Sequence, residues 1–273
     1  MDILITGGIG DFICVESHMS PAEKASVNKV YLATRAEEGI RNLLDSYPIF
    51  PNLTGVITVW TDWSEIFGFV HHEQMRDFLA GRQVELPPME TVDYSIFRVF
   101  PQIAYGERRY HGSSLLRSSK AELIQDFGLP DVYCVINPYS PNDRQNGVRD
   151  FTSREWESVL KLLSRSKRIG VVVNHGDDLI PQHEMLRDLS LRTTLTQAVE
   201  VIKKARWFIG IDSFVPALAA QFMPPEHMVV KTRNAHYISY LPIYLAPHRH
   251  FDFVHCGLTY LSNWGDHDII KYI

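Results

Sequence analysis

The feature that most constrains the fold is an alternation of short β-branched runs with helical stretches along the chain. In the first part, the predicted strands are residues 2–6, 28–33, 54–60 and 92–97, and helix candidates lie at 35–46 and 72–79. Strands that alternate with helices are typical of parallel sheets whose helices act as crossovers. The sequence therefore predicts an α/β fold.

A second series of strands and helices begins after Gly128-Leu129-Pro130, which we interpret as a helix stop and a domain boundary. The strands predicted beyond it are 133–137, 168–173, 207–211 and 227–231, and the helices are 153–163, 195–204 and 215–222. This βαβαβαβ order predicts a second parallel sheet with right-handed crossovers. We expect Rossmann-like domains over residues 1–130 and 131–250, and a segment 251–273 that packs back on the first domain.

Composition and charge narrow the classes of function. The chain has 273 residues, of which 45% are apolar, and its net charge of −5 argues against binding a long nucleic acid mainly through its phosphates. The cysteines, Cys14, Cys134 and Cys256, are far apart and suggest neither a disulfide framework nor a zinc site. With no secretion signal and no apolar run long enough to span a bilayer, a cytoplasmic protein is expected.

A glycine-rich turn follows the first predicted strand. Residues 3–6 run into Gly7-Gly8-Ile9-Gly10-Asp11, and glycines let the backbone pass close to a ligand. A helix is expected next, and its first amides are a natural anion site. Asp11 would stand at the carboxyl end of the first strand, where open α/β sheets place their ligands. The alternative is a tight turn in which Asp11 caps the helix.

Polar residues follow two strands of the second half. Asp212 and Ser213 come directly after the apolar strand 207–211 and before a predicted helix, so they could accept from sugar hydroxyls and donate to phosphate, or simply cap the helix. In the loop after strand 133–137, Ser140, Asn142 and Arg144 can donate to phosphate. A solvated loop is the alternative. His175 follows another strand and could line a nucleotide pocket or be a loop residue without a function.

The order of these motifs resembles the heptosyltransferase-type glycosyltransferases of family 9. That resemblance implies the glycosyltransferase-B (GT-B) fold, in which two Rossmann-like domains with parallel sheets face a central cleft. The matching motifs are Gly10-Asp11, Asn137-Pro138, the Trp156 helix, His175-Gly176, Thr193-Thr194-Leu195 and Asp212-Ser213. By resemblance, Asp11 is the catalytic base. The positions assigned to donor binding are Gly8, Gly10, Ser140, Asn142, Arg144, His175, Thr194, Asp212 and Ser213.

Two positions depart from the pattern of that family. The family continues Asp-Ser/Thr with a Gly and then a His three residues later, where this chain has Phe214 and Ala217. The first change replaces an open backbone approach with an aromatic ring, and the second removes a possible phosphate donor. A donor held differently, a different donor and a protein that binds without catalysis all stay open.

The resemblance implies a metal-independent transfer of a sugar from a nucleotide-sugar donor to a glycan, a lipid-linked acceptor or a modified nucleic-acid base. No cofactor or metal site is expected, because His71-His72 and His248-Arg249-His250 lack ligand spacing and acidic partners. The alternatives are a non-catalytic nucleotide- or glycan-binding protein of the same fold, and an epimerase or reductase. The basic stretch 108–120 would face an anionic acceptor or form a solvated linker. The sequence carries no signal for the oligomeric state.

Overall fold

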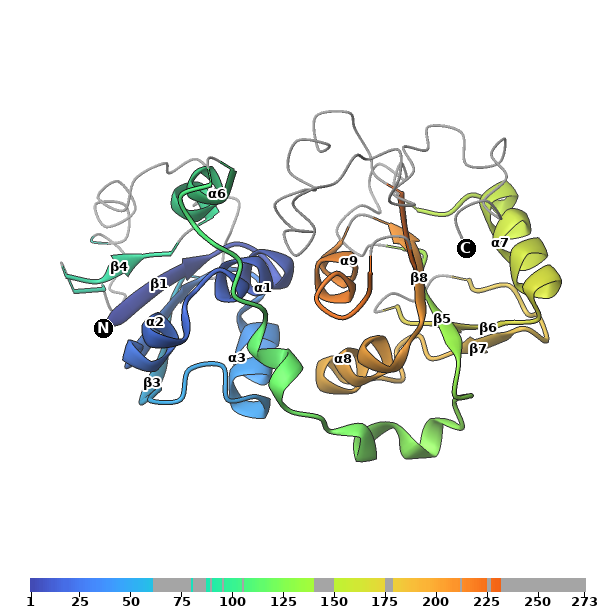
Figure 1. Cartoon of the computed structure of the whole chain (residues 1–273), viewed down its shortest axis with the longest axis horizontal. Coiled ribbons are helices and arrows are strands. Elements are labelled where there is room, and N and C mark those ends of the chain that lie inside the picture. The colour runs from blue at the N-terminus through green and yellow to red at the C-terminus, as the bar shows by residue number, and fades with distance from the viewer. Residues whose placement is uncertain are drawn as a thin grey trace. The chain divides into compact units, whose positions relative to one another are not determined.

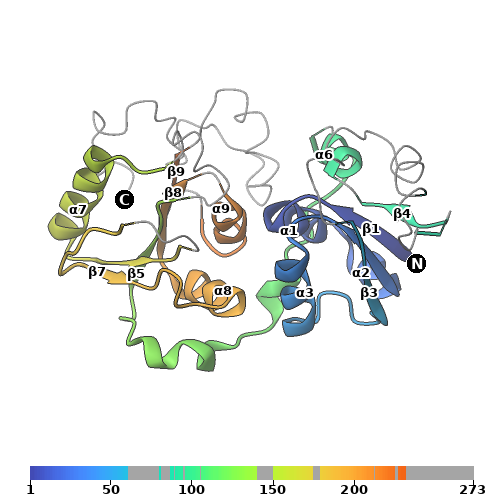
Figure 2. The same cartoon turned by 180° about the vertical axis from the view of Figure 1, so that it is seen from behind.

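The computed structural model of the chain divides into two compact units, Met1–Ser118 and Ser119–Ile273, and each unit contains one parallel sheet with helices packed on it (Figures 1 and 2). The described residues are 1–60, 80, 87–88, 90–94, 96–104, 106–139, 150–174, 179–211, 213–224 and 227–231. The predicted α/β fold with two parallel sheets is confirmed.

The sheet of the first unit has the strand order β3-β2-β1-β4, with every neighbouring pair parallel. Its strands are β1 (Asp2–Thr6), β2 (Lys29–Ala33), β3 (Gly55–Trp60) and β4 (Val92–Asp93), and its helices are α1 (Ile9–Ser17), α2 (Pro21–Ser26), α3 (Glu37–Ser46) and α6 (Ile96–Ala104). The last four residues of β1 are buried, as expected for a strand covered on both faces. The carboxyl end of β1 is therefore a fixed point on which a site can be built.

One predicted strand of this unit is mostly wrong. The segment 92–97 forms strand only at Val92–Asp93, and the helix α6 begins at Ile96. Val99 and Ile103, four residues apart, are both buried, so the apolar residues after 95 fit one face of a helix. The predicted helix 72–79 lies outside the described residues.

The sheet of the second unit has the order β7-β6-β5-β8-β9, again all parallel. Its strands are β5 (Tyr133–Asn137), β6 (Ile169–Val172), β7 (Leu186–Asp188), β8 (Trp207–Ile211) and β9 (Met228–Lys231), and its helices are α7 (Ser153–Ser166), α8 (Leu195–Lys204) and α9 (Phe214–Ala219). Figures 1 and 2 show α7 on one face of this sheet and α8 and α9 on the other. The predicted strands and helices here are confirmed; β7 is additional and too short to leave a pattern.

The two units meet in sequence earlier than the predicted boundary at residue 130. Two short 3₁₀ helices, η1 (Ser114–Arg117) and η2 (Ala121–Phe127), flank the division after Ser118. The second packs on α8, where the Gln197 side chain donates a hydrogen bond to the Leu123 carbonyl at 3.2 Å. Residues 119–130 thus belong to the second unit because η2 is held by α8. The predicted packing of segment 251–273 lies outside the described residues.

The described cysteines belong to the core. Cys14 and Cys134 are buried, and burial raises the pKa of the Cys134 thiol to about 12, so this thiol stays protonated at neutral pH. A buried neutral thiol behaves as a small apolar side chain. No helix among the described residues has the length and apolar character that crossing a bilayer requires.

Candidate functional site

The glycine-rich turn leads from β1 directly into α1, as predicted. Gly8 is the residue at which α1 starts, and Asp11 lies in the first turn, half-buried. The Gly8 amide donates a hydrogen bond to Oδ2 of Asp11 at 2.5 Å. Gly10, also predicted as a site residue, is buried within the same turn. Asp11 thus holds the start of the helix, as the capping alternative stated, and it also lies at the carboxyl end of β1.

Gly7 makes room for the Asp11 carboxylate. Its φ of +102° lies in a region that residues with side chains rarely adopt. A Cβ atom at this position would lie 2.5 Å from Oδ2 of Asp11. Both the backbone conformation and the close approach of the carboxylate therefore require glycine here.

Thr34, which directly follows the neighbouring strand β2, holds the turn in place by a hydrogen bond. It follows β2, is 1% exposed, and its hydroxyl donates to the carbonyl oxygen of Gly7. The same hydroxyl oxygen accepts from the Ala36 amide at 2.9 Å. Thr34 was not among the site residues predicted from the sequence. The available signal was a polar residue at the end of an apolar strand, next to the strand that carries the glycine turn.

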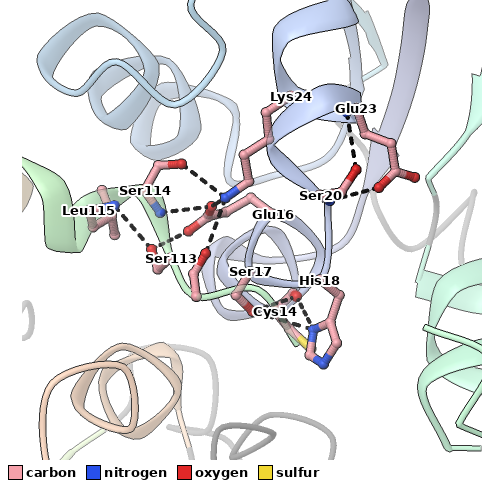
Figure 3. A network of polar contacts seen from close by, with 11 residues as sticks. Cys14, Glu16, Ser17, His18, Ser20, Glu23, Lys24, Ser113, Ser114 and Leu115 are labelled. Carbon is pink, nitrogen blue, oxygen red and sulfur yellow. Dashed lines mark hydrogen bonds and ion pairs between the residues drawn. The ribbon is translucent and has the colours of Figure 1, made fainter. Parts of the chain in front are cut away.

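A buried ion pair anchors the later part of α1 (Figure 3). Lys24 Nζ lies 2.6 Å from Oε2 of Glu16, and both side chains are almost fully buried. Lys24 also donates to Oγ of Ser114 at 2.9 Å and to the Gly112 carbonyl at 3.2 Å, which uses all three of its donors. Glu16 accepts from the Ser113 hydroxyl and the Ser114 amide. This network attaches residues 112–114 to α1, so a solvated linker was the wrong alternative for that part of the basic stretch.

Polar and aromatic side chains lie at the C-terminal end of α1. Nδ1 of His18 lies 2.8 Å from the carbonyl oxygen of Cys14, and because a carbonyl only accepts, Nδ1 carries the proton. The ring of Tyr110 meets the His18 ring edge-on with centroids 5.7 Å apart. Burial, and secondly the negative charge of Glu16, raise the pKa of Tyr110 to about 12. Asp11 is therefore carried by a helix that is firmly anchored at its other end.

Asn137 organises the carboxyl edge of the second sheet. It ends β5 and is 3% exposed, its amide nitrogen donates to the Val173 carbonyl at 2.9 Å, and its oxygen accepts from the Ser213 hydroxyl at 2.8 Å. Gly210 lies opposite Asn137 in the sheet, and a Cβ there would come within 2.8 Å of the Asn137 carbonyl oxygen. Asn137 thus joins the ends of β5, β6 and β8. From the sequence, Asn137 was the last residue of an apolar strand and part of the Asn137-Pro138 motif, with no role assigned to its side chain.

Two hydroxyl residues that were predicted to bind the nucleotide-sugar donor lie among the described residues, and both cap helices. Ser213 precedes α9 and accepts from the Val215 amide at 3.2 Å while it donates to Asn137. Thr194 precedes α8, accepts from the Gln197 amide at 3.2 Å and donates its own amide to the Gln197 side chain at 2.9 Å. The capping alternative stated for Ser213 describes its contact, and the cap at Thr194 was not predicted. A phosphate contact from the Ser213 hydroxyl would replace its bond to Asn137.

The remaining predicted donor-binding positions lie outside the described residues: Ser140, Asn142, Arg144, His175 and Asp212. Of the two positions that depart from the family pattern, Phe214 begins α9 and Ala217 is buried in the same helix. Within the described ranges, no three His, Cys, Asp or Glu side chains gather in a way that could hold a metal ion.

Comparison with known proteins identifies similar folds but no close relative. No protein-family model and no curated protein match the sequence. Among solved structures, the Escherichia coli ADP-heptose LPS heptosyltransferase II matches with a TM-score of 0.51 and 14% identity over 85% of this chain and 84% of that chain. The UDP-GlcNAc 2-epimerase from Methanocaldococcus jannaschii matches with a TM-score of 0.52 and 11% identity over 99% of this chain and 90% of that chain.

A family 9 glycosyltransferase from Veillonella parvula is also similar, with a TM-score of 0.49 and 14% identity over 85% of this chain and 79% of that chain. At these identities the likeness is one of fold. The chain therefore has a GT-B-like α/β fold with two parallel sheets, which it shares with a heptosyltransferase and with a UDP-GlcNAc 2-epimerase.

Proposed function

We propose that this chain is a glycosyltransferase that moves a sugar from a nucleotide-sugar donor to an acceptor hydroxyl, with Asp11 as the general base. The observation that carries the proposal is the start of α1, where an acidic side chain at the carboxyl end of β1 is held by the Gly8 amide. The turn that holds it is shaped by Gly7 and Thr34. A fold shared with a heptosyltransferase supports the same reading.

In the proposed reaction, Asp11 removes the proton of the acceptor hydroxyl while the oxygen of that hydroxyl forms a bond to the anomeric carbon of the donor sugar. The bond between that carbon and the diphosphate breaks, and the nucleoside diphosphate leaves with the electron pair. A helix N-terminus favours the negative charge that the base needs. On the donor side, Asp212, which precedes Ser213 in the sequence, would accept from sugar or ribose hydroxyls. The charge of the leaving diphosphate would be stabilised without a metal by helix amides after Asp212, by the Ser140 or Ser213 hydroxyl and by an arginine of residues 144–149.

A nucleotide panel tests this proposal directly. Thermal shift is measured with ADP, UDP, GDP and CMP and with sugar conjugates that include ADP-heptose and UDP-GlcNAc. A ligand at 100 times its Kd stabilises the folded state by about 2.7 kcal/mol, which gives a clear rise in Tm. We expect one nucleoside diphosphate to stabilise the protein, and Asp11→Asn to keep that shift while losing sugar transfer. If no nucleotide or nucleotide sugar of the panel raises Tm, the proposal is contradicted.

An epimerase is the second candidate, because the Methanocaldococcus jannaschii UDP-GlcNAc 2-epimerase shares the fold over nearly the whole chain. An epimerase changes its nucleotide sugar without any acceptor, whereas a transferase needs one. Incubation of the stabilising nucleotide sugar with the protein alone, followed by NMR of the sugar, separates the two. A new epimer supports the second candidate, and an unchanged sugar that is consumed only with an acceptor supports the first.

A further inference from the structure

Positive charge gathers along the edge of the second sheet where its strands begin. We define this basic edge by residues 131–132, 165–168, 203–206 and 227, which precede β5, β6, β8 and β9. Its cationic side chains are Arg165, Lys167, Arg168, Lys203, Lys204 and Arg206. The acidic side chains beside them among the described residues are Asp131, Glu184 and Glu200, and Glu200 pairs with Lys203 at 3.1 Å. The edge is therefore cationic in a protein of net charge −5.

Helix capping explains only part of this charge. Arg165 and Lys203–Lys204 lie in the last turns of α7 and α8, where cations are favoured by the helix dipole. Lys167, Arg168 and Arg206 lie beyond these helices, in the connections to β6 and β8. The α1 and α3 helices carry no basic residue in their last turns. The basic edge thus carries more positive charge than the helix ends alone account for.

Strand register brings these connections together around one apolar side chain. Tyr133 pairs with Ile169 in β6, which places Val132 level with Arg168, and the Arg206 amide donates to the Tyr133 carbonyl at 2.9 Å. Val132 is 55% exposed. Arg165, Lys167, Lys204 and Arg206 are also exposed. The edge therefore presents an exposed apolar residue with cationic connections on both sides of it.

A buried tryptophan orders the arginines of the edge. The guanidinium carbon of Arg168 lies 3.6 Å from the centroid of the Trp207 ring, and that of Arg206 lies 5.9 Å from it. Trp207 is only 9% exposed, so its ring supports the guanidinium groups that stack on it and is not open to stack on a ligand. Arginines held in this way lose less freedom when they bind phosphate.

We propose that the basic edge docks the protein on the surface of an anionic phospholipid bilayer. Phosphates spread over a surface need neither a groove nor a stacking ring, and each nearby Lys or Arg adds to the attraction. Single-stranded nucleic acids are usually held by exposed aromatic rings, and the aromatic ring of this edge is covered. Docking through the strand beginnings leaves the opposite, carboxyl edge with Asn137 and Ser213 facing away from the lipid. The proposal goes beyond glycosyl transfer and stands independently of it.

Vesicle sedimentation tests the proposal with two independent pairs of substitutions. The purified chain is mixed with vesicles of neutral phosphatidylcholine, with or without about a third of phosphatidylglycerol, at low and physiological salt. We expect binding to the anionic vesicles that weakens with salt. Lys204→Glu/Arg206→Glu and Arg165→Glu/Lys167→Glu should each lower the affinity at least about tenfold. The melting temperature of each variant verifies that it is folded, and having two pairs keeps the test valid if one is not.

A matched control changes the same charge on the opposite edge. Arg154 and Arg192 are exposed at the start of α7 and after β7, and Arg154→Glu/Arg192→Glu alters the net charge as much as either pair on the basic edge. Retained vesicle binding in this control, with loss in both basic-edge variants, supports the proposal. Equal loss in all three variants would mean a net-charge effect and overturn it. Failure to bind anionic vesicles at low salt, or tighter binding to a single-stranded oligonucleotide, would overturn it as well.

Discussion

Helix α1 begins differently from four other helices of this chain. The N-cap residues of α2, α7, α8 and α9 are Ser20, Thr152, Thr194 and Ser213, and in each case the hydroxyl accepts from a backbone amide of the first turn. The N-cap of α1 is Gly8, which has no side chain that could accept, and the Asp11 carboxylate accepts from the Gly8 amide. Four starts are thus closed by a hydroxyl, and α1 is closed by its acid alone.

The difference separates a structural acid from a candidate functional one. Glu155 occupies the same helix position in α7 as Asp11 does in α1, but it is 4% exposed and bonds to both the amide and the hydroxyl of Thr152. Glycine at a helix start costs only a few tenths of a kcal/mol relative to Ser or Thr. Stability therefore tolerates either arrangement, while an open backbone beside an acid at a strand end suits a ligand site.

The largest expected effect comes from removing the charge of each acid. Asp11→Asn keeps an oxygen to accept from Gly8, so the fold should be retained while sugar transfer falls about 10²- to 10⁴-fold because the base is lost. Glu155→Gln should leave the rate within about twofold and lower only the stability, by about 1 kcal/mol. Steady-state kinetics and thermal unfolding of both variants check this. Equal effects on the rate would remove the distinction between the two acids.

Gly7→Ala changes the turn and leaves Asp11 itself in the sequence. The new methyl group would meet Oδ2 of Asp11, and φ of +102° is strained for alanine, so we expect a loss of about 1–3 kcal/mol in the free energy of unfolding. The carboxylate must also move, so transfer should fall toward the level of Asp11→Asn. Urea denaturation and the transfer assay measure the two effects. A stable variant with full activity would show that Gly7 does not position Asp11.

Asn137→Ala tests the corresponding edge of the second sheet. It leaves the Val173 carbonyl and the Ser213 hydroxyl without the amide that joins them, and should cost about 1–3 kcal/mol. Ser213→Ala alone should cost about 1 kcal/mol as a lost cap. Because the two side chains are bonded, their effects in a double-mutant cycle should differ from additivity by at least about 0.5 kcal/mol. Additive effects would contradict the role of Asn137 in holding Ser213.

The strands and helices of the second unit could be predicted from the sequence because their apolar patterns extend over many residues and their helix caps are common residue types. Thr152 and Thr194, with an acid or amide three residues later, mark their helix starts in the sequence itself. The segment 92–97 was mistaken for a longer strand because an apolar run of that length suits either a strand or one face of a helix. Pro101 inside α6 added to the ambiguity.

The site was only partly visible in the sequence, because its polar partners are distant along the chain. Asp11 stood out at the end of a strand, but Thr34, which holds the Gly7 carbonyl, and Asn137, which holds Ser213, are 27 and 76 residues from these partners. The Lys24–Glu16 pair likewise binds Ser114 across 90 positions. Single-sequence periodicity reports local structure and does not predict such contacts. For Ser213 the capping alternative describes the observed contact, since a polar residue before a helix predicts a cap on local grounds, whereas Thr194 was predicted only as a donor-binding residue and also caps a helix.

The smallest expected effect comes from giving α1 the start that the other helices have. In Gly8→Ser the new Cβ would lie 3.5 Å from Oδ2 of Asp11, an ordinary contact, and the hydroxyl could accept from the Asp11 amide as Ser20 does from Glu23. The free energy of unfolding should rise by a few tenths of a kcal/mol. If the first amides of α1 take part in binding, the added hydroxyl competes for them, so ligand affinity should fall severalfold while stability does not. Unchanged affinity in a fully folded Gly8→Ser variant would show that the glycine start of α1 carries no function and that Asp11 acts without its neighbouring amides.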